Sequence, residues 1–294
     1  MPDCGPTRSG RNAFRSQEVR PGAPMQDVSP SAIAVDRLAS GAAGVSAGQR
    51  WVAEETPIAI VHDGSAYAVM MATPADLEDF AVGFSLTEGV IADRSEVRDL
   101  DIEVGELGVE LRLWLASRPS AALAARRRSL AGPTGCGLCG IESLEALRRP
   151  KSRPLAEIAR LSPGAIREAM ASLDAGQVLG SRTRAVHAAG FWREGDGLVL
   201  LREDVGRHNA VDKLVGAMAR AGAAPAGVLV LTSRVSVELV EKAAAAAIPV
   251  IAAVSAPTAL AIRTAEAAGV TLVAVARADG FEVFTRPDRL CLAG

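Results

Sequence analysis

The 294-residue sequence contains few of the residues that build disulfide frameworks or metal sites. Its four cysteines are too few for a disulfide scaffold, and its three histidines are scattered singly. These residues are Cys4, Cys136, Cys139, Cys291, His62, His187 and His208. A structural zinc site usually needs four clustered ligands, so we expect no structural metal.

An excess of positive charge is also absent. The formal net charge is −2, which argues against nucleic acid as a partner. The basic residues are almost all arginine, because the only lysines are Lys151, Lys213 and Lys242. Beside abundant alanine, this excess of arginine is typical of GC-rich coding. The alternative is that some arginines bind phosphate groups as bidentate forks.

No apolar N-terminal run precedes a cleavage-like site, so the sequence predicts no signal peptide. Residues 243–262 are nearly all apolar, but Pro249 and Pro257 divide them, and we interpret them as buried core rather than a membrane span. We therefore expect a cytoplasmic protein with no membrane partner. In a reducing compartment, a Cys-x-x-Cys pair is more often reactive or metal-binding than structural.

The chain divides into four segments by composition and periodicity. Residues 1–45 are rich in Gly, Pro, Ser, Arg and Ala and predict a disordered tail. Residues 46–123 predict a small β-rich domain, and residues 124–155 a basic flexible loop that contains the Cys-x-x-Cys pair. Residues 156–294 alternate helix and strand, which is typical of an α/β domain whose parallel sheet is covered by helices.

The hydrophobic periodicity locates the individual elements. Strands are expected at residues 57–61, 67–71, 108–115, 186–191, 197–202, 227–231, 250–254, 271–276 and 282–285. Helices are expected at residues 76–87, 163–173, 209–221, 235–247 and 257–268. Asp63-Gly64, between the first two strands, is typical of a tight hairpin turn.

The most informative feature present is the pair Cys136 and Cys139, in Gly-Cys-Gly-Leu-Cys-Gly. A helix predicted just after the pair favours the thiolate form through its free N–H groups and dipole. A thiolate suits a redox couple, half of a zinc site or a sulfur carrier. The missing further ligands disfavour zinc, and the loop setting disfavours a thioredoxin-like couple. An exposed, basic loop suits a cysteine that carries persulfide sulfur. The alternative is that both cysteines are surface residues without a function.

A second cluster of polar residues spans Arg202 to Lys213, between a predicted strand and a predicted helix. Ligands of open α/β sheets bind beyond the carboxyl ends of strands. Arg207, His208 and Lys213 are therefore suited to hold an anion at the helix start. The alternatives are helix capping, with Asn209 as N-cap, and dimer contacts.

Two hydroxyl-bearing loops follow the next predicted strands, and together they suit a phosphate or nucleotide cradle. They contain Ser233, Arg234, Ser255 and Thr258. Each loop alone is also a simple helix cap. Near the C-terminus, aromatic side chains and an arginine are suited to stack on a base or pterin ring, with a plain edge strand as the alternative. These residues are Phe281, Glu282, Val283, Phe284, Thr285 and Arg286.

His187 invites comparison with zinc deaminases, which use His-x-Glu followed by Pro-Cys-x-x-Cys. Here the glutamate position is Ala189, and the cysteine pair precedes the histidine. Deaminase chemistry is therefore not expected, and His187 is interpreted as a packed, hydrogen-bonded residue.

From about residue 54 onward, the chain resembles the formate dehydrogenase accessory sulfurtransferase family (FdhD). The resemblance rests on Thr73-Pro74 to Gly89, on Cys136-Gly-Leu-Cys-Gly140, and above all on the run Glu203-Asp-Val-Gly-Arg-His-Asn-Ala-Val-Asp-Lys213. It implies an α/β/α domain like that of cytidine deaminase, without the deaminase activity, beside the smaller β-rich domain.

The resemblance also implies a function. It implies a cytoplasmic homodimer that takes sulfur from a cysteine desulfurase. The sulfur passes to the bis-molybdopterin guanine dinucleotide molybdenum cofactor that the formate dehydrogenase catalytic subunit needs. It further implies that Cys136 carries the persulfide and that residues 281–286 contact the cofactor. The hypothesis is a sulfurtransferase, with Arg207, His208, Ser233, Arg234, Ser255 and Thr258 at the GDP-like part of the cofactor. The alternatives are a non-enzymatic, cofactor-binding chaperone and a thiol redox protein.

Overall fold

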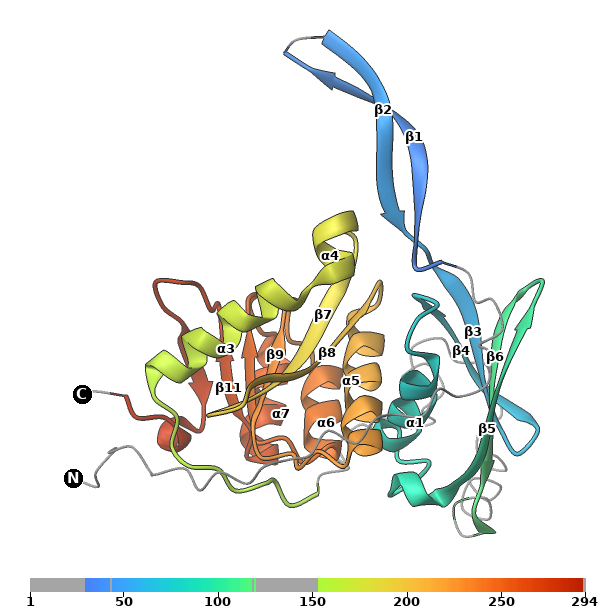
Figure 1. Cartoon of the computed structure of the whole chain (residues 1–294). Helices are drawn as coiled ribbons and strands as arrows, with labels where there is room; N and C mark the ends of the chain where they lie inside the picture. The colour runs from blue at the N-terminus through green and yellow to red at the C-terminus, as the bar shows by residue number, and fades with distance from the viewer. Residues whose placement is uncertain (1–29, 43, 118, 120–152, 293–294) are drawn as a thin grey trace.

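The computed structural model describes residues 30–42, 44–117, 119 and 153–292, which form three β-sheets and their covering helices (Figure 1). The strands are β1 (Ala32–Gly41), β2 (Gly44–Ala53), β3 (Thr56–His62), β4 (Ser65–Ala72), β5 (Val97–Gly105), β6 (Gly108–Leu115), β7 (His187–Arg193), β8 (Gly197–Asp204), β9 (Val228–Leu231), β10 (Val250–Ala253), β11 (Thr271–Ala274) and β12 (Glu282–Thr285). The α-helices are α1 (Leu77–Thr87), α3 (Pro163–Gly176), α4 (Val178–Thr183), α5 (Arg207–Ala221), α6 (Val237–Ala245) and α7 (Ala259–Ala268), with short 3-10 helices at Arg94–Glu96 and Pro287–Arg289.

The larger part of the fold is a six-stranded sheet with the order β12-β11-β10-β9-β7-β8. Strands β9, β10 and β11 are parallel, whereas β7, β8 and β12 run antiparallel to their neighbours. Helix α3 packs on one face of this sheet, and α5, α6 and α7 cover the other face (Figure 1). The α/β/α layers predicted for this part of the chain are confirmed.

The smaller sheet has the order β4-β3-β6-β5, and α1 closes its apolar face with Phe80 and Phe84. The turn between β3 and β4 has positive φ at Asp63 (48°) and Gly64 (72°), as the Asp-Gly pair predicts. The apolar residues of β3 and β6 alternate and point toward α1, which explains why the sequence pattern located these strands.

Helices α1 and α5 join the two parts at an unusually close crossing. A Cβ atom on Gly83 would lie 1.7 Å from the backbone oxygen of Asp212, and one on Gly216 would lie 1.9 Å from that of Asp79. Only glycine at both positions allows the two backbones to approach this closely. The crossing fixes the smaller sheet against the helices of the larger one (Figure 1).

Most of the expected elements are present, but strands β1, β2 and β5 and helix α4 were not predicted. Strand β5 and helix α4 lie where no element was expected. The prediction of a disordered tail through residue 45 is wrong for residues 32–45 that the structure describes, because β1 and the first two residues of β2 lie there, in a long hairpin. The segment with Cys136 and Cys139 lies outside the described residues. Among the described helices, none combines the length and apolar character needed to cross a membrane.

Candidate functional site

The candidate site lies at one edge of the six-stranded sheet. Strands β9 and β10 end there, while β7 begins and β8 ends there because both run antiparallel. The antiparallel course of β7 and β8 brings His187 near Arg207 and Arg234. In addition to burial, the charges of both arginines therefore lower the pKa of His187. Loops from distant parts of the sequence therefore converge, as the position of the predicted strands suggested.

Helix α5 begins at this edge, with Gly206 as its N-cap and Arg207 and His208 in its first turn. The Nε atom of Arg207 is buried and has no hydrogen-bond partner among the described residues. Buried donors are nearly always bonded in native proteins, so this donor is suited to an acceptor that the described residues do not supply. Helix N-termini favour anions, which makes a phosphate or carboxylate the natural acceptor.

The two histidines at this edge are neutral near pH 7. Burial and the neighbouring charge of Arg207 lower the pKa of His208 from 6.5 to about 4. Burial and the charges of Arg207 and Arg234 also lower the pKa of His187. The positive charge of the site therefore comes from the two guanidinium groups, which stay protonated.

Two polar residues at this edge escaped the sequence-based prediction. His208 Nε2 lies 3.3 Å from Ser236 Oγ and 3.8 Å from Glu238 Oε2. Burial raises the pKa of Glu238, but hydrogen bonds from Ser236 and the backbone, with the nearby charges, lower it overall. The available signal was Ser-x-Glu directly after the Thr232–Arg234 loop, at the start of α6. These groups fix the His208 ring beside Arg207.

The two hydroxyl-bearing loops lie side by side, joined by a parallel bridge between Val235 and Pro257. Their hydroxyl groups differ in availability. Ser233 Oγ is buried and donates to the backbone oxygen of Arg234, and Thr258 caps α7 by accepting from Ala261 N at 3.2 Å. Ser255 is half-buried at the end of β10. The capping alternative therefore holds for Thr258, while Arg234 is the exposed cation of the cradle.

The site residues predicted near the C-terminus, residues 281–286, lie in and beside β12. This strand runs from the candidate edge of the sheet toward the opposite edge. Its antiparallel pairing with β11 places Glu282 opposite Ala274, at the candidate edge, and Thr285 opposite Leu272, toward the other edge. Thr285 is buried and donates to Val270 O at 2.7 Å. The remaining side chains divide between the two faces: Phe281 and Val283 pack on the α3 side, Phe284 packs on the α5–α7 side, and Arg286 pairs with Asp288. The structure thus keeps Phe281 and Glu282 near the site and does not bring Thr285 and Arg286 there.

Most polar residues in the run from Glu203 to Lys213 form ion pairs or hydrogen bonds inside the protein and do not face the candidate site. Lys213 is completely buried, pairs with Asp204 at 2.6 Å and donates to Thr73 O at 2.8 Å. The expectation that Lys213 holds an anion at the helix start is therefore wrong. Asn209 is not the N-cap either, because its Nδ2 donates to Asp204 Oδ1 and Met71 O inside the protein.

The remaining charged residues of this run have structural partners as well. The Glu203 carboxylate accepts from Leu179 N and Gly180 N at the start of α4, both at 2.7 Å. Asp212 accepts from Lys242 at 2.8 Å and from the Thr87 hydroxyl at 2.6 Å. Burial lowers the pKa of Lys242, but the charges of Asp212 and Glu88 outweigh burial and raise it. Arg207 and His208 are the members of the run that face the site edge.

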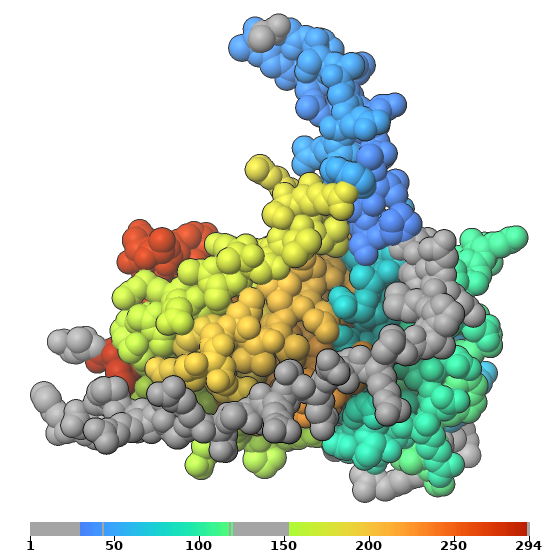
Figure 2. Space-filling model, viewed as in Figure 1, coloured from blue at the N-terminus to red at the C-terminus, as the bar shows by residue number. Residues whose placement is uncertain are grey.

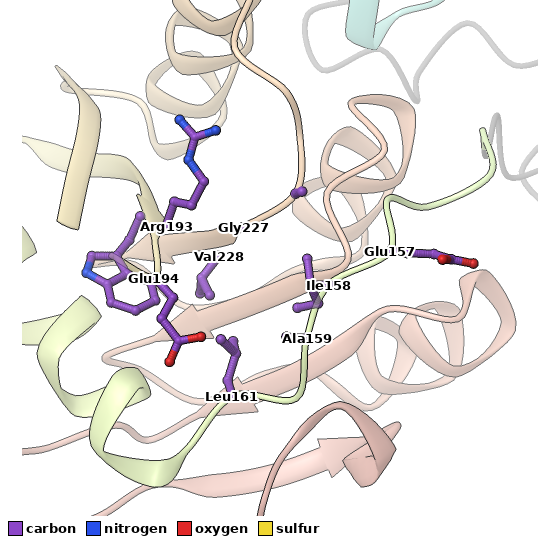
Figure 3. A pocket seen from close by; sticks show the side chains of 10 residues that line it. Glu157, Ile158, Ala159, Leu161, Arg193, Glu194, Gly227 and Val228 are labelled. Atoms are coloured by element: carbon purple, nitrogen blue, oxygen red, sulfur yellow. The ribbon is translucent and has the colours of Figure 1, made fainter. Parts of the chain in front are cut away.

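A separate cavity of about 270 Å³ lies at the opposite edge of the sheet (Figure 3). Ile158, Leu161 and Val228 form its apolar wall, and Glu157 and Glu194 add carboxylates. This is where β7 ends and β9 begins, so the cavity is not continuous with the Arg207 edge. Within residues 30–42, 44–117 and 153–292, no group of three His, Cys, Asp or Glu side chains is placed to hold a metal ion.

Comparison with known proteins gives a consistent result. The model of the FdhD/NarQ family matches residues 53–291. The chain is 51% identical over 246 residues to the "Sulfur carrier protein FdhD" of Agrobacterium fabrum, covering 83% of this chain and 91% of that protein. It is 48% identical over 280 residues to the protein of the same name from Cupriavidus necator, covering 94% and 96%. A crystal structure assigned to a formate dehydrogenase accessory protein from Desulfotalea psychrophila superposes with a TM-score of 0.71 and 29% identity, covering 89% of this chain and all of that chain.

Proposed function

This chain belongs to the FdhD/NarQ family, and we propose from that membership that it is a sulfurtransferase serving formate dehydrogenase. Relatives of similar length carry the name sulfur carrier protein. The proposed donor is a cysteine desulfurase. The proposed acceptor is the bis-molybdopterin guanine dinucleotide molybdenum cofactor, which is the protein's substrate and cargo.

The proposed first step loads Cys136. Its thiolate attacks the outer sulfur of the desulfurase persulfide, the donor S–S bond breaks, and the donor cysteine leaves with the electron pair. Cys136 then carries the sulfur as Cys-S-SH. No oxidant or reductant is needed, because one S–S bond is exchanged for another.

Cys139 has a proposed role in the second step. Its thiolate attacks the inner sulfur of the Cys136 persulfide, and the outer sulfur leaves as hydrosulfide with the electron pair. The products are hydrosulfide for the cofactor and a Cys136–Cys139 disulfide, so the two thiols supply the electrons. A cellular thiol then reduces the disulfide before the next cycle.

One observation supports an anionic cargo: at the start of α5, the Nε of Arg207 is buried and has no hydrogen-bond partner within the part of the chain that the structure describes. The charge of Arg234 acts on the same histidine, His187, as that of Arg207. Phosphate accepts paired hydrogen bonds from a guanidinium fork, and the helix N-terminus adds favourable dipoles. We assign the diphosphate of the guanine nucleotide to this edge, with Ser255 beside it and Phe281 at the margin. His208, neutral and held by Ser236, contributes a hydrogen bond rather than a charge.

Intact mass spectrometry tests the proposed sulfur chemistry. The protein is incubated with cysteine desulfurase and cysteine, and we expect a gain of one sulfur atom, ~32 Da, that Cys136→Ala abolishes. Cys139→Ala should still gain sulfur but release it more slowly, and Cys4→Ala is the matched control. The chaperone alternative predicts that Cys136→Ala still supports formate dehydrogenase activity. The redox alternative predicts a reversible Cys136–Cys139 disulfide without any added sulfur. Absence of added sulfur, or formate dehydrogenase activity with Cys136→Ala, contradicts the proposal; a disulfide alone does not, because the proposed second step forms one.

A further inference from the structure

The four-stranded sheet has one face covered by α1 and an outer face lined by exposed side chains. On β6, the buried residues that face α1 alternate with exposed or half-buried ones, which therefore point outward. The register with β5 places acidic residues next to them. Both strands lie at the end of the molecule remote from β11, and their atoms reach the surface there (Figures 1 and 2). The outward residues of β5 and β6, here called the acidic face, are Asp99, Asp101, Glu103, Glu110, Arg112 and Trp114.

The acidic face carries more negative charge than its own cation neutralises. It has four carboxylates and one guanidinium group, and that group, on Arg112, pairs with Glu103 and Glu110. Neither Asp99 nor Asp101 forms an ion pair with another residue of the described ranges. Two exposed carboxylates are therefore available to a cation that the described residues do not supply.

The indole ring of Trp114 adds a feature that favours arginine. Trp114 lies opposite Asp99 and is 38% exposed. An aromatic face attracts a guanidinium group, whose planar edge remains free to pair with a carboxylate. The same contact occurs elsewhere in this chain, where the guanidinium carbon of Arg182 lies 3.4 Å from the centre of the Trp51 ring. Trp114, with the carboxylates of Asp99 and Asp101, therefore suits an arginine side chain.

A source of arginine is present in the same chain. Residues 120–152, here called the basic segment, lie outside the described residues and contain Cys136 and Cys139. The segment has six basic residues against two acidic ones, Glu142 and Glu145. The basic residues are Arg126, Arg127, Arg128, Arg148, Arg149 and Lys151.

The chain enters and leaves the basic segment beside the acidic face. Before the segment, Ser117 Oγ accepts from Arg98, in β5, at 3.3 Å. After the segment, Arg153 lies close enough to Asp93 for its charge to act on that carboxylate. Hydrogen bonds from Ser95 lower the pKa of Asp93, burial opposes them, and the charge of Arg153 lowers it further. Asp93 caps the short helix that leads into β5, so both ends of the segment lie near the start of this strand.

We propose that the acidic face binds the basic segment of the same chain, with an arginine from residues 126–128 held by Trp114 and the two available carboxylates. Residue 126 follows Ser117 by nine positions, and nine extended residues span up to about 30 Å. The acidic face measures roughly 14 Å along β5, from Asp99 to Glu103. The three arginines are therefore within reach of the whole face.

The attachment of the segment decides between it and a separate partner protein. Exposed ion pairs and a single cation–π contact are individually weak. Because the basic segment is attached beside the face at both ends, its arginines are present there at a roughly millimolar effective concentration. A separate protein would have the same few contacts at a much lower concentration, so the observations favour the segment. This docking gives Cys136 a resting position near β5, and it does not depend on the proposed sulfur chemistry.

Limited trypsin digestion of the full-length protein tests the docking, because trypsin cleaves after arginine and a bound arginine is protected. We expect cleavage at residues 126–128 to be about fivefold faster in Asp99→Asn/Asp101→Asn than in the wild type. Trp114→Thr, which keeps a residue suited to a strand, should also be cleaved faster. The matched control, Glu194→Gln/Asp279→Asn, removes two exposed carboxylates from the larger part of the fold and should keep the wild-type rate.

The variants of the acidic face should not unfold the protein, because residues 99, 101 and 114 lie outside the three hydrophobic cores. Thermal unfolding checks this expectation. An unchanged cleavage rate in Asp99→Asn/Asp101→Asn, or an equal increase in the control, overturns the proposal.

Photo-crosslinking identifies what the acidic face binds. A photo-crosslinking amino acid at position 110 should join the acidic face to a peptide of the basic segment, in a product that keeps the mass of one chain. The same amino acid at position 260, which is exposed on α7, should not do so. A product of twice the chain mass, or no crosslink to residues 120–152, overturns the proposal.

Charge reversal tests the pairing itself. Arg126→Glu/Arg127→Glu/Arg128→Glu should abolish the crosslink, and adding Asp99→Lys/Asp101→Lys should restore it. Failure to restore the crosslink contradicts the assigned contact. Persulfide formation on Cys136 is measured on the same samples. Sulfur loading with unprotected arginines overturns the docking alone, and protected arginines without sulfur loading overturn the proposed function alone.

Discussion

The ammonium nitrogen of Lys213 lies 2.6 Å from a carboxylate oxygen of Asp204, and both side chains are completely buried. Thr73 completes the arrangement, since its N–H donates to Asp204 at 3.0 Å and its carbonyl oxygen accepts from Lys213 at 2.8 Å. Val205 N donates to the Thr73 hydroxyl at 3.1 Å. The loop before α1 is therefore held to the start of α5, and the smaller sheet keeps its place beside the candidate site.

Lys213→Met should destabilise the protein by about 3–5 kcal/mol, because it leaves the Asp204 carboxylate buried without a counter-charge. Chemical unfolding measures the change. The double variant Asp204→Asn/Lys213→Met removes both charges and should lose less stability than the sum of the single variants. Additive losses would show that the two charges do not stabilise each other.

Gly83→Ala should destabilise the protein by at least about 3 kcal/mol, since an added methyl group at 1.7 Å from Asp212 O forces α1 away from α5. Gly216→Ala should behave in the same way. Gly164→Ala, in the first turn of α3 with its nearest neighbour at 3.4 Å, is the control and should unfold at the wild-type temperature or slightly above it. Equal unfolding temperatures for Gly83→Ala and Gly164→Ala would contradict the close crossing.

The sequence was sufficient to predict the α/β class and most elements of the larger sheet, because buried strands such as β9 and β10 are short, continuous apolar runs. It also placed Arg207 and Arg234 at one edge, since both follow predicted strands. It could not show that Lys213, six residues after Arg207, is turned into the core, because helix periodicity alone does not say which polar groups have buried partners. The hairpin of β1 and β2 escaped prediction because most of its side chains are exposed on both faces, so the alternation of apolar and polar residues that marks a strand is missing.

Stability should fall between pH 7 and pH 5, in part through His208. Its pKa is about 4 in the fold against 6.5 in the unfolded chain, so the unfolded state gains the proton as the pH falls below 6.5. Burial and Arg207 cause this shift, Lys242 adds to it, and Glu238 and Glu88 oppose it. His208→Gln should remove up to about 2 kcal/mol of the pH-dependent loss. Urea unfolding of both proteins at the two pH values measures the difference, and parallel pH profiles would contradict a neutral, buried His208.

Arg207→Ala should weaken binding of GDP, used here as a probe of the nucleotide part of the cofactor, by roughly 10- to 100-fold. The reason is the loss of charge-assisted hydrogen bonds worth about 1.5–3 kcal/mol. Arg207→Lys keeps the charge without the planar fork and should bind with intermediate affinity. Arg193→Ala is the matched control, because Arg193 lies at the opposite edge of the sheet, paired with Asp196 at 2.7 Å. Isothermal titration calorimetry measures all four proteins. If the wild type does not bind GDP, or if Arg193→Ala binds GDP as weakly as Arg207→Ala, the assignment of the nucleotide to the Arg207 edge is wrong.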